Sequence, residues 1–406
     1  MKLFVPVERS DGETRVALSP DTAKKLVGLG FEVIVEAGAG TASRVLDAQY
    51  VAAGARIGKA GEMASADIVL KVCRPTPAES TNCKRGSLVI AAMDPYGHES
   101  DVAAMAKAGI SAFAMEFMPR ITRAQSMDVL SSQANLAGYQ AVIEAAAVYD
   151  RAMPLMMTAA GTVAAARVFV MGAGVAGLQA IATARRLGAV VSATDVRPAA
   201  KEQVESLGGK FIAVEDDEFR QAETAAGYAK EMSKEYREKQ AALVAAHIAK
   251  QDIVITTALI PGRPAPRLVT NAMLLSMAPG SVAVDLAVER GGNVEGAKLG
   301  EVTRVGGVSI VGYPNMAGRI AATASQLYAK NLLAFVETMV DKESKVLAVK
   351  WDDELVKATL LTRDGQIVHP AFAAKDAAAA APASEKRSKA KTGNVTQGKA
   401  IDGAAK

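Results

Sequence analysis

Short apolar runs alternate with helical stretches along the first third of the chain. The runs have the length of buried strands and lie at 2–6, 31–36, 67–72, 87–93 and 110–116. The helical stretches between them lie at 20–28, 48–53, 62–66 and 100–108. Ser19 is the expected N-cap of the first helix, with Pro20 at its first position. Strands separated by helices predict a parallel sheet with both faces covered.

A long helix from near Val129 to Met153 leads into a second set of strands. These are predicted at 168–171, 190–194, 210–214, 252–258, 281–286 and 308–311. An amphipathic helix over 321–339 can return the chain to the first sheet. The predicted fold is α/β, with two Rossmann-like, doubly wound parallel-sheet domains and a cleft between them. The predicted domain limits are 1–138 completed by 320–370, then 139–319, with a flexible tail over 371–406.

The segment from Arg167 to Asp195 combines a strand, a glycine turn, a helix and a second strand. Gly172 permits a tight turn, Gly174 lets the backbone approach a pyrophosphate, and Gly177 lets the helix lie close to the strand. The unpaired N–H groups at the start of that helix then face the phosphates. Glycine turns also serve packing alone, but the complete pattern favours dinucleotide binding.

Asp195 indicates which dinucleotide the turn holds. Its carboxylate ends the second strand, eighteen residues past Gly177, where it meets the adenosine ribose hydroxyls and repels a 2′-phosphate. Arg197 lies beside it and would attract that phosphate instead. Because Asp195 occupies the position that contacts the ribose, the pattern favours NAD over NADP.

Charge and composition exclude several classes of protein. The net charge of +4 belongs to the tail from residue 371, which carries seven Lys or Arg and three acids. The remaining chain is formally neutral, so nucleic-acid binding loses its support. Cys73 and Cys83 are the only cysteines and the three histidines are scattered, so no metal site is expected. No run reaches the roughly 18 apolar residues of a membrane span and no signal peptide is recognised, which favours a cytoplasmic protein.

A polar stretch interrupts the second domain between residues 215 and 236. A simple crossover needs only about 2 to 6 loop residues. The stretch holds the acidic run 215–218 and the segment 225–229. Its surplus length fits a functional loop and a disordered surface insertion equally well.

Several segments together resemble the family of alanine dehydrogenases and proton-translocating NAD(P) transhydrogenases. Segments 13–20 and 31–40 are similar to the opening of both kinds of protein. Segment 118–139 resembles a nucleotide-contacting loop of the NAD(H)-binding transhydrogenase component, and 222–230 resembles its mobile loop. The resemblance covers nearly all of the chain up to about Pro370.

This resemblance implies a nucleotide site drawn from several stretches, with NAD(H) as the cofactor and no metal. Contacts along 120–131 are implied for Arg120, Ile121, Thr122, Gln125, Ser126, Met127, Asp128 and Ser131. Of these, Gln125, Asp128 and Arg120 are implied to act at the nicotinamide, with Gln125 nearest the ring. Beside the glycine turn, contacts are implied for Val175, Asp195, Val196 and Arg197, while Gly227, Tyr228, Gln240 and Leu259 line or close the site.

By residue type alone, these side chains have other interpretations. Arg120 equally fits a surface ion pair. Gln125 and Asp128 are three residues apart and fit a solvated helix face or an N-terminal cap. Tyr228 fits a packed aromatic residue.

The two kinds of relative differ in their chemistry. Alanine dehydrogenases need side chains that exchange protons as hydride moves, for which the resemblance implies a lysine, a histidine and an aspartate. Lys71 occupies the first position, Ala92 falls at the second, with His98 six residues later, and Glu289 stands at the third. Direct hydride transfer between two nucleotides needs no such groups, so Lys71 is expected to be an ordinary strand-end cation.

The resemblance therefore implies an NAD(H)-binding transhydrogenase component that exchanges hydride with NADP(H) on a partner. The implied partners are NADP(H)-binding and membrane-spanning subunits that couple transfer to proton movement. They would hold this chain on the cytoplasmic side of the inner membrane, and a homodimer is implied as well. Two alternatives stay open: an alanine dehydrogenase-like oxidoreductase and a non-catalytic NAD-sensing protein.

Overall fold

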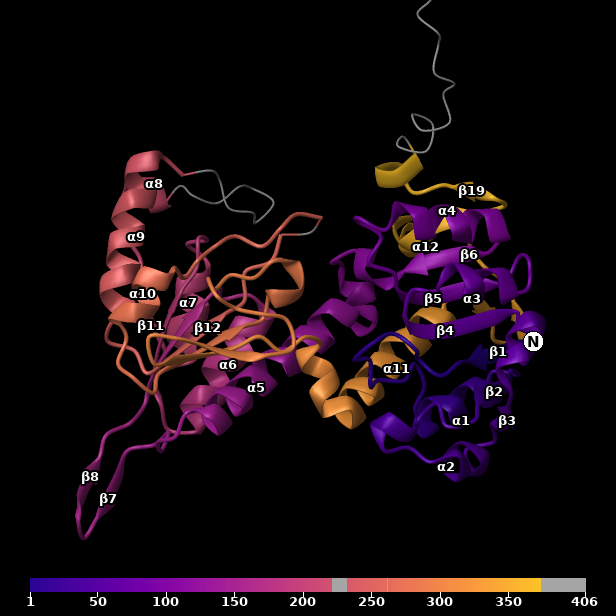
Figure 1. The fold of residues 1–406 in the computed structure, drawn as a ribbon. Helices are drawn as coiled ribbons and strands as arrows, with labels where there is room; N and C mark the ends of the chain where they lie inside the picture. Colours follow the sequence, from indigo (N-terminus) through magenta and orange to yellow (C-terminus); the bar gives the residue numbers. More distant parts are fainter. Residues whose placement is uncertain (221–231, 261, 374–406) are drawn as a thin grey trace, which may run out of the picture.

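The computed structural model describes residues 1–220, 232–260 and 262–373. Two lobes lie side by side in Figure 1. We call the region around an eight-stranded sheet the first lobe and the region around a seven-stranded sheet the second lobe. Both sheets are mostly parallel and carry helices, which confirms the predicted α/β class with two Rossmann-like sheets.

The first sheet has the strand order β19-β18-β6-β5-β4-β1-β2-β3. Its six parallel strands are β1 (Lys2–Val5), β2 (Glu32–Glu36), β3 (Arg56–Gly58), β4 (Ile68–Cys73), β5 (Leu88–Ala92) and β6 (Ser111–Ala114). Two antiparallel strands from the end of the chain extend it, β18 (Leu360–Arg363) and β19 (Gln366–Ile367). Its helices are α1 (Pro20–Gly28), α2 (Asp47–Ala52), α3 (Pro77–Asn82), α4 (Glu99–Ala108) and α12 (Glu354–Thr359). As expected, Ser19 caps α1 by accepting the Thr22 N–H.

The second sheet has the order β11-β10-β9-β12-β13-β15-β14, in which only β14 is antiparallel to its neighbour. Its strands are β9 (Arg167–Met171), β10 (Val190–Thr194), β11 (Lys210–Phe211), β12 (Ile253–Thr256), β13 (Val282–Asp285), β14 (Val302–Val305) and β15 (Val308–Val311). Its helices are α6 (Val175–Arg186), α7 (Ala200–Ser206), α8 (Asp217–Arg220), α9 (Lys234–Ile248) and α10 (Asn271–Ser276). The order reverses between β9 and β12, so the carboxyl ends of these strands flank the crevice where ligands of such sheets bind.

Two long helices connect the lobes (Figure 1). Helix α5 (Val129–Val148) starts in the first core with Val129 and ends in the second core with Ala141 and Ala145. Helix α11 (Ala321–Glu337) packs on α5 and buries Tyr328, Leu332 and Phe335 in the first core, so it does return to the first lobe. Two hairpins lie outside the sheets: β7 (Met156–Thr158) with β8 (Gly161–Val163), and β16 (Val340–Asp341) with β17 (Val346–Leu347).

Several predicted boundaries were wrong. The long helix ends at Val148 rather than Met153, because the chain turns there toward the hairpin β7–β8. The stretch 62–66 overlaps the 3₁₀ helix η2 (Ala60–Ser65) and is not an α-helix. The tail was placed from residue 371, yet Phe372 is only 2% exposed and packs in the first lobe beside Tyr96. Residues 374–406 lie outside the described residues.

Candidate functional site

The glycine turn after β9 has the geometry that its sequence pattern predicts. Gly172 adopts φ +104°, a conformation that residues with a side chain rarely take. A Cβ added to Gly177 would lie 1.8 Å from the carbonyl oxygen of Gly172. Only glycine therefore lets α6 start so close to the turn. Gly138 of α5 makes a similar approach, because its Cβ would lie 2.0 Å from the Ala176 carbonyl oxygen.

Gly174 faces open space, in contrast to Gly172 and Gly177. It is the N-cap of α6, it provides no side-chain cap, and a Cβ added there would meet no atom within 4 Å. No side chain caps the first N–H groups of α6, and the space beside Gly174 is open. A pyrophosphate fits this cradle, because the helix dipole and the N–H groups both favour an anion.

Asp195 lies directly beside the glycine turn. One of its carboxylate oxygens accepts the N–H of Ala173 at 2.7 Å. The other accepts the backbone N–H and the Nε of Arg197, both at 2.9 Å. Asp195 and Arg197, which were expected to have opposite effects on a 2′-phosphate, therefore form an ion pair with each other. Val196, between them, is exposed.

The segment 120–131 runs from the first lobe into α5. Asp128 is the N-cap of α5: it accepts the Ser131 N–H at 2.8 Å and the Ser131 hydroxyl at 2.5 Å, so the capping interpretation holds. Gln125 is exposed on the 3₁₀ helix η4 (Thr122–Met127). The side chain of Met127, however, packs in the first core, so this side chain does not face the cleft. Arg120 is exposed and has no ion pair with a described residue.

A cavity of about 1040 Å³ lies between the lobes. Three predicted residues line it together: Arg120 and Asp128 from the first lobe and Leu259 from the second. Leu259 follows β12, whose carboxyl end lies at the same sheet edge as the glycine turn after β9. The described lining of the cavity thus brings Arg120 and Asp128 opposite the loop after β12, and it includes no residue of the glycine turn.

The other predicted residues have mixed positions. Val175 is exposed on the first turn of α6. Gln240 of α9 has a structural task, because its amide accepts the Val214 N–H at 2.8 Å and donates to the Thr194 hydroxyl at 3.2 Å. Gly227 and Tyr228 lie outside the described residues.

The carboxylates in the described lining of this cleft all have partners within the protein. Asp94 forms an ion pair with Arg290, and Glu116 accepts the backbone N–H groups of Met93 and Asp94. Burial raises the pKa of Glu116, against the opposing effect of these hydrogen bonds. Asp128 caps α5, and Glu289 accepts the N–H of Asn315 at 3.2 Å. The described lining contains no lysine and no histidine.

Lys71 is not an ordinary strand-end cation, and this expectation was wrong. Its side chain is 2% exposed, and its ammonium lies 3.2 Å from a Glu8 oxygen and 3.1 Å from a Glu79 oxygen. Burial opposes its charge, but the two carboxylates outweigh burial and hold the pKa of Lys71 above its usual value. Burial also raises the pKa of Glu8. Held in this triad, Lys71 cannot serve as a proton acceptor at neutral pH.

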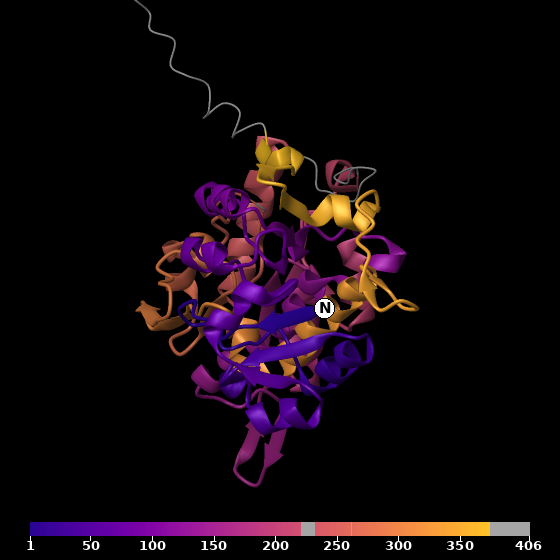
Figure 2. The same ribbon diagram turned by 90° about the vertical axis from the view of Figure 1, so that its right-hand side faces the viewer.

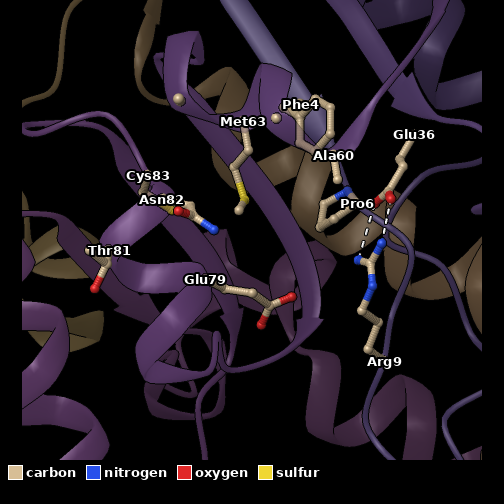
Figure 3. Close-up of a pocket in the computed structure, with 12 residues that line it drawn as sticks. Phe4, Pro6, Arg9, Glu36, Ala60, Met63, Glu79, Thr81, Asn82 and Cys83 are labelled. Carbon is tan, nitrogen blue, oxygen red and sulfur yellow. Dashed lines mark hydrogen bonds and ion pairs between the residues drawn. The ribbon is translucent and has the colours of Figure 1, made fainter.

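A second cavity, of about 520 Å³, lies within the first lobe (Figure 3). Arg9 and Glu36 pair across one side of it, and Glu36 also accepts the Val7 N–H at 2.8 Å. Glu79 on the other side is bonded to Lys71 and to the Thr76 N–H. Since its described charged groups are already paired within the protein, this cavity offers a ligand no unpaired charge.

Sequence reasoning missed the residues 94–97, which line the cleft from the first lobe. Their sequence, Asp-Pro-Tyr-Gly, has the composition of a turn directly after a strand, and that was the available signal. Within the described chain, no helix combines the length and apolar character needed to span a bilayer. The same residues contain no cluster of His, Cys, Asp and Glu suited to a metal ion.

Comparisons with known proteins place the chain among relatives of both kinds. The alanine dehydrogenase/PNT N-terminal domain matches residues 4–137, and the corresponding C-terminal domain matches 141–370. A Rhodospirillum rubrum protein, named as the first section of NAD(P) transhydrogenase subunit alpha, is 56% identical over 93% of this chain and 100% of that protein. A transhydrogenase structure from Sinorhizobium meliloti is 66% identical with a TM-score of 0.84, over 91% of this chain and 100% of that one. An alanine dehydrogenase of Halomonas elongata is 33% identical, over 92% of this chain and 96% of that protein.

Proposed function

Because the chain belongs to the alanine dehydrogenase/PNT family, we propose that it binds NAD(H) in the cleft and exchanges hydride with NADP(H) held by a partner subunit. Hydride leaves the dihydronicotinamide of NADH, which becomes NAD⁺, and reduces NADP⁺ to NADPH. Both electrons and the hydrogen travel together, so no side chain has to accept or supply a proton. The protein's task is to hold one ring in place and keep it dry.

The glycine turn and Asp195 support the nucleotide site in this proposal. The open space at Gly174 suits the pyrophosphate, and Asp195 stands where the adenosine ribose would lie. The segment carrying Arg120, Gln125 and Asp128 would then meet the nicotinamide half. The family resemblance assigns Gly227 and Tyr228 to a loop that closes the site, and we include both residues in the proposed site.

The lining of the cleft is the observation that carries the choice of reaction. Amino-acid oxidation requires a proton acceptor beside the ring. The described lining has neither lysine nor histidine, and its four carboxylates already bond to the protein. Lys71 is locked between Glu8 and Glu79. The purified chain should therefore bind NADH but show no alanine-dependent reduction of NAD⁺; robust reduction would overturn the proposal.

Asp195→Asn should narrow the preference for NADH over NADPH. The amide still accepts the Ala173 N–H, so the turn keeps its geometry, but the charge that repels a 2′-phosphate and pairs with Arg197 is lost. We expect NADH affinity to fall about tenfold, about 1.4 kcal/mol, and NADPH affinity to fall less. Titration of both nucleotides against the variant and the wild type measures this. An unchanged ratio of the two dissociation constants would remove Asp195 from its proposed role.

The hairpin β7–β8 supports a homodimer, which belongs to the proposal. It projects from the second lobe, away from both sheets, in Figures 1 and 2. Leu155, just before its first strand, is 62% exposed, and Met157, on that strand, is 87% exposed. A lone two-stranded hairpin is marginal in water, and exposed apolar side chains of this kind mark an association surface. A second copy of the chain would cover them.

Met157→Glu should convert the dimer to monomer at micromolar concentration, because it places a charge in the covered surface. Sedimentation velocity measures the change, with the wild-type chain expected to be dimeric. Leu275→Glu is the matched control, since Leu275 is an exposed apolar residue on α10, away from the hairpin. A variant at Met157 that sediments like the wild-type dimer would contradict the dimer proposed here.

The proposal also includes the partners. We infer that NADP(H)-binding and membrane-spanning subunits carry the second nucleotide and the proton path, and that they hold this chain at the cytoplasmic face of the inner membrane. The likeness to a protein named as one section of a transhydrogenase alpha subunit supports this inference.

A further inference from the structure

Residues 94–97, which we call the rim turn, connect β5 to α4 where the two lobes meet. We propose that Asp94 and Tyr96 are positioning residues that hold two loops of the second lobe against the first lobe and so set the width of the cleft at its nicotinamide end. The two loops follow β12 and β13, and both line the cleft opposite the rim turn. This inference rests on the proposed nucleotide site.

The rim turn is fixed to the first lobe through its backbone. Asp94 adopts φ +45°, in the left-handed region that few residues other than glycine, asparagine and aspartate enter. Glu116 holds this conformation by accepting the N–H of Met93 at 3.0 Å and the N–H of Asp94 with its other oxygen. Glu116 lies four residues before Arg120, so one carboxylate ties the rim turn to the segment that carries Arg120 and Asp128.

The side chain of Asp94 reaches across to the second lobe. Its carboxylate pairs with Arg290, which ends the 3₁₀ helix η5 (Val288–Arg290) after β13. Arg74 and His98 also lie near this carboxylate, each with a nitrogen at 3.8 Å. The carbonyl of Arg290 accepts the N–H of Ala265 at 2.8 Å. A single ion pair thus connects the first lobe to the loops after both β12 and β13.

Tyr96 makes the second connection between the lobes. A Cβ added to Gly262 would lie 3.1 Å from the Tyr96 ring, so the ring packs directly on that glycine of the second lobe. On the first-lobe side, the ring lies 5.0 Å from the Phe372 ring and 5.9 Å from the Phe117 ring, measured between centroids. Tyr96 is therefore held in an aromatic cluster of one lobe while it contacts the other lobe three residues after Leu259.

This arrangement predicts that a wider cleft weakens the contacts of the nicotinamide half of the nucleotide and not those of the adenosine half. The adenosine and pyrophosphate would contact the glycine turn and Asp195, which both belong to the second lobe. The nicotinamide half would touch both lobes, through Arg120 and Asp128 on one side and Leu259 on the other. A cleft that widens at the rim turn should weaken binding of NADH and leave binding of ADP-ribose, which lacks the nicotinamide, unchanged.

The test measures both ligands on the full chain, NADH by its fluorescence and ADP-ribose by calorimetry. Asp94→Asn keeps a residue that tolerates the left-handed backbone and removes the charge. We expect NADH to bind about three- to fivefold more weakly, as for one partly exposed ion pair, with ADP-ribose within about twofold of wild type. Arg290→Gln should match this, and the double variant should add nothing further. Glu32→Gln, which removes an exposed ion pair with Arg56 inside the first lobe, is the control.

Tyr96 gives an independent pair of variants. Tyr96→Ala should weaken NADH binding about tenfold with ADP-ribose unchanged, whereas Tyr96→Phe keeps the ring and should bind both ligands like the wild type. The inference is overturned if Asp94→Asn and Tyr96→Ala bind NADH as the wild type does, or if they lose both ligands equally. A wild-type chain that binds neither ligand would instead overturn the proposed function, and this inference with it.

Discussion

Replacement of Lys71 by methionine is expected to lower the free energy of unfolding by about 3–5 kcal/mol, because it leaves the buried carboxylate of Glu8 and the partly buried carboxylate of Glu79 without their shared cation. Glu79 accepts a hydrogen bond from the Lys71 ammonium, and Glu8 pairs with it through Oε2, an oxygen that has no hydrogen-bond partner among the described residues. Urea unfolding followed by circular dichroism measures the loss. Lys84→Met is the matched control: Lys84 pairs with Asp67 at an exposed site, so we expect a change below about 1 kcal/mol.

The loss of stability caused by Lys71→Met should depend on pH in a defined direction. Burial already raises the pKa of Glu8 in the wild-type protein, and loss of the lysine raises it further. A carboxyl group with a raised pKa binds its proton more tightly in the folded state, so the folded variant gains stability as pH falls toward the usual carboxyl range. The difference in unfolding free energy between the wild type and Lys71→Met should therefore become smaller as the pH falls from 8 to about 5. A deficit below about 1 kcal/mol at pH 8 would contradict the triad.

Gly174→Ala should separate nucleotide binding from folding. Gly174 has φ −76°, which alanine adopts readily, and its Cβ would meet no atom within 4 Å. Stability should therefore change by less than about 1 kcal/mol. The added methyl group would occupy the space proposed for the pyrophosphate, so NADH affinity should fall about 100-fold, about 2.7 kcal/mol.

Gly177→Ala is the informative comparison for that variant. Its Cβ would lie 1.8 Å from the Gly172 carbonyl oxygen, so the turn itself must move, and both stability and binding should suffer. NADH titration and thermal unfolding of the two variants give the contrast. If Gly174→Ala binds NADH like the wild type, the glycine turn is a packing device and the proposed site is wrong.

The sequence predicted those features of the fold that local patterns encode. Strand periodicity predicted five strands of the first sheet and six of the second, but not β3, β14, β18 and β19. The G-x-G-x-x-G spacing predicted the tight turn and close helix packing that Gly172 and Gly177 have. The Asp128 cap was one of two interpretations of its spacing from Gln125, and it proved correct. The hairpin β7–β8 was missed because Leu155 to Met157 is an apolar run, which local rules assign to a core rather than to an exposed arm.

The features that the sequence did not predict depend on contacts between residues that lie far apart in the chain. The burial of Lys71 depends on Glu8, sixty-three positions earlier in the chain, and no periodicity connects the two. Asp94 meets Arg290 across 196 positions, so the turn composition of residues 94–97 showed a turn but not its contact with the other lobe. Such contacts arise only once two sheets and two connecting helices fix how the lobes face each other.

The most direct test of the central claim is hydride transfer from NADH to an NADP⁺ analogue, with this chain added to membranes that contain the proposed partner subunits. The account predicts transfer that requires both the chain and the membranes, that Gly174→Ala lowers by weakening NADH binding, and that added alanine does not affect. Alanine-dependent reduction of NAD⁺ by the chain alone, without transfer between nucleotides in the mixture, would contradict it.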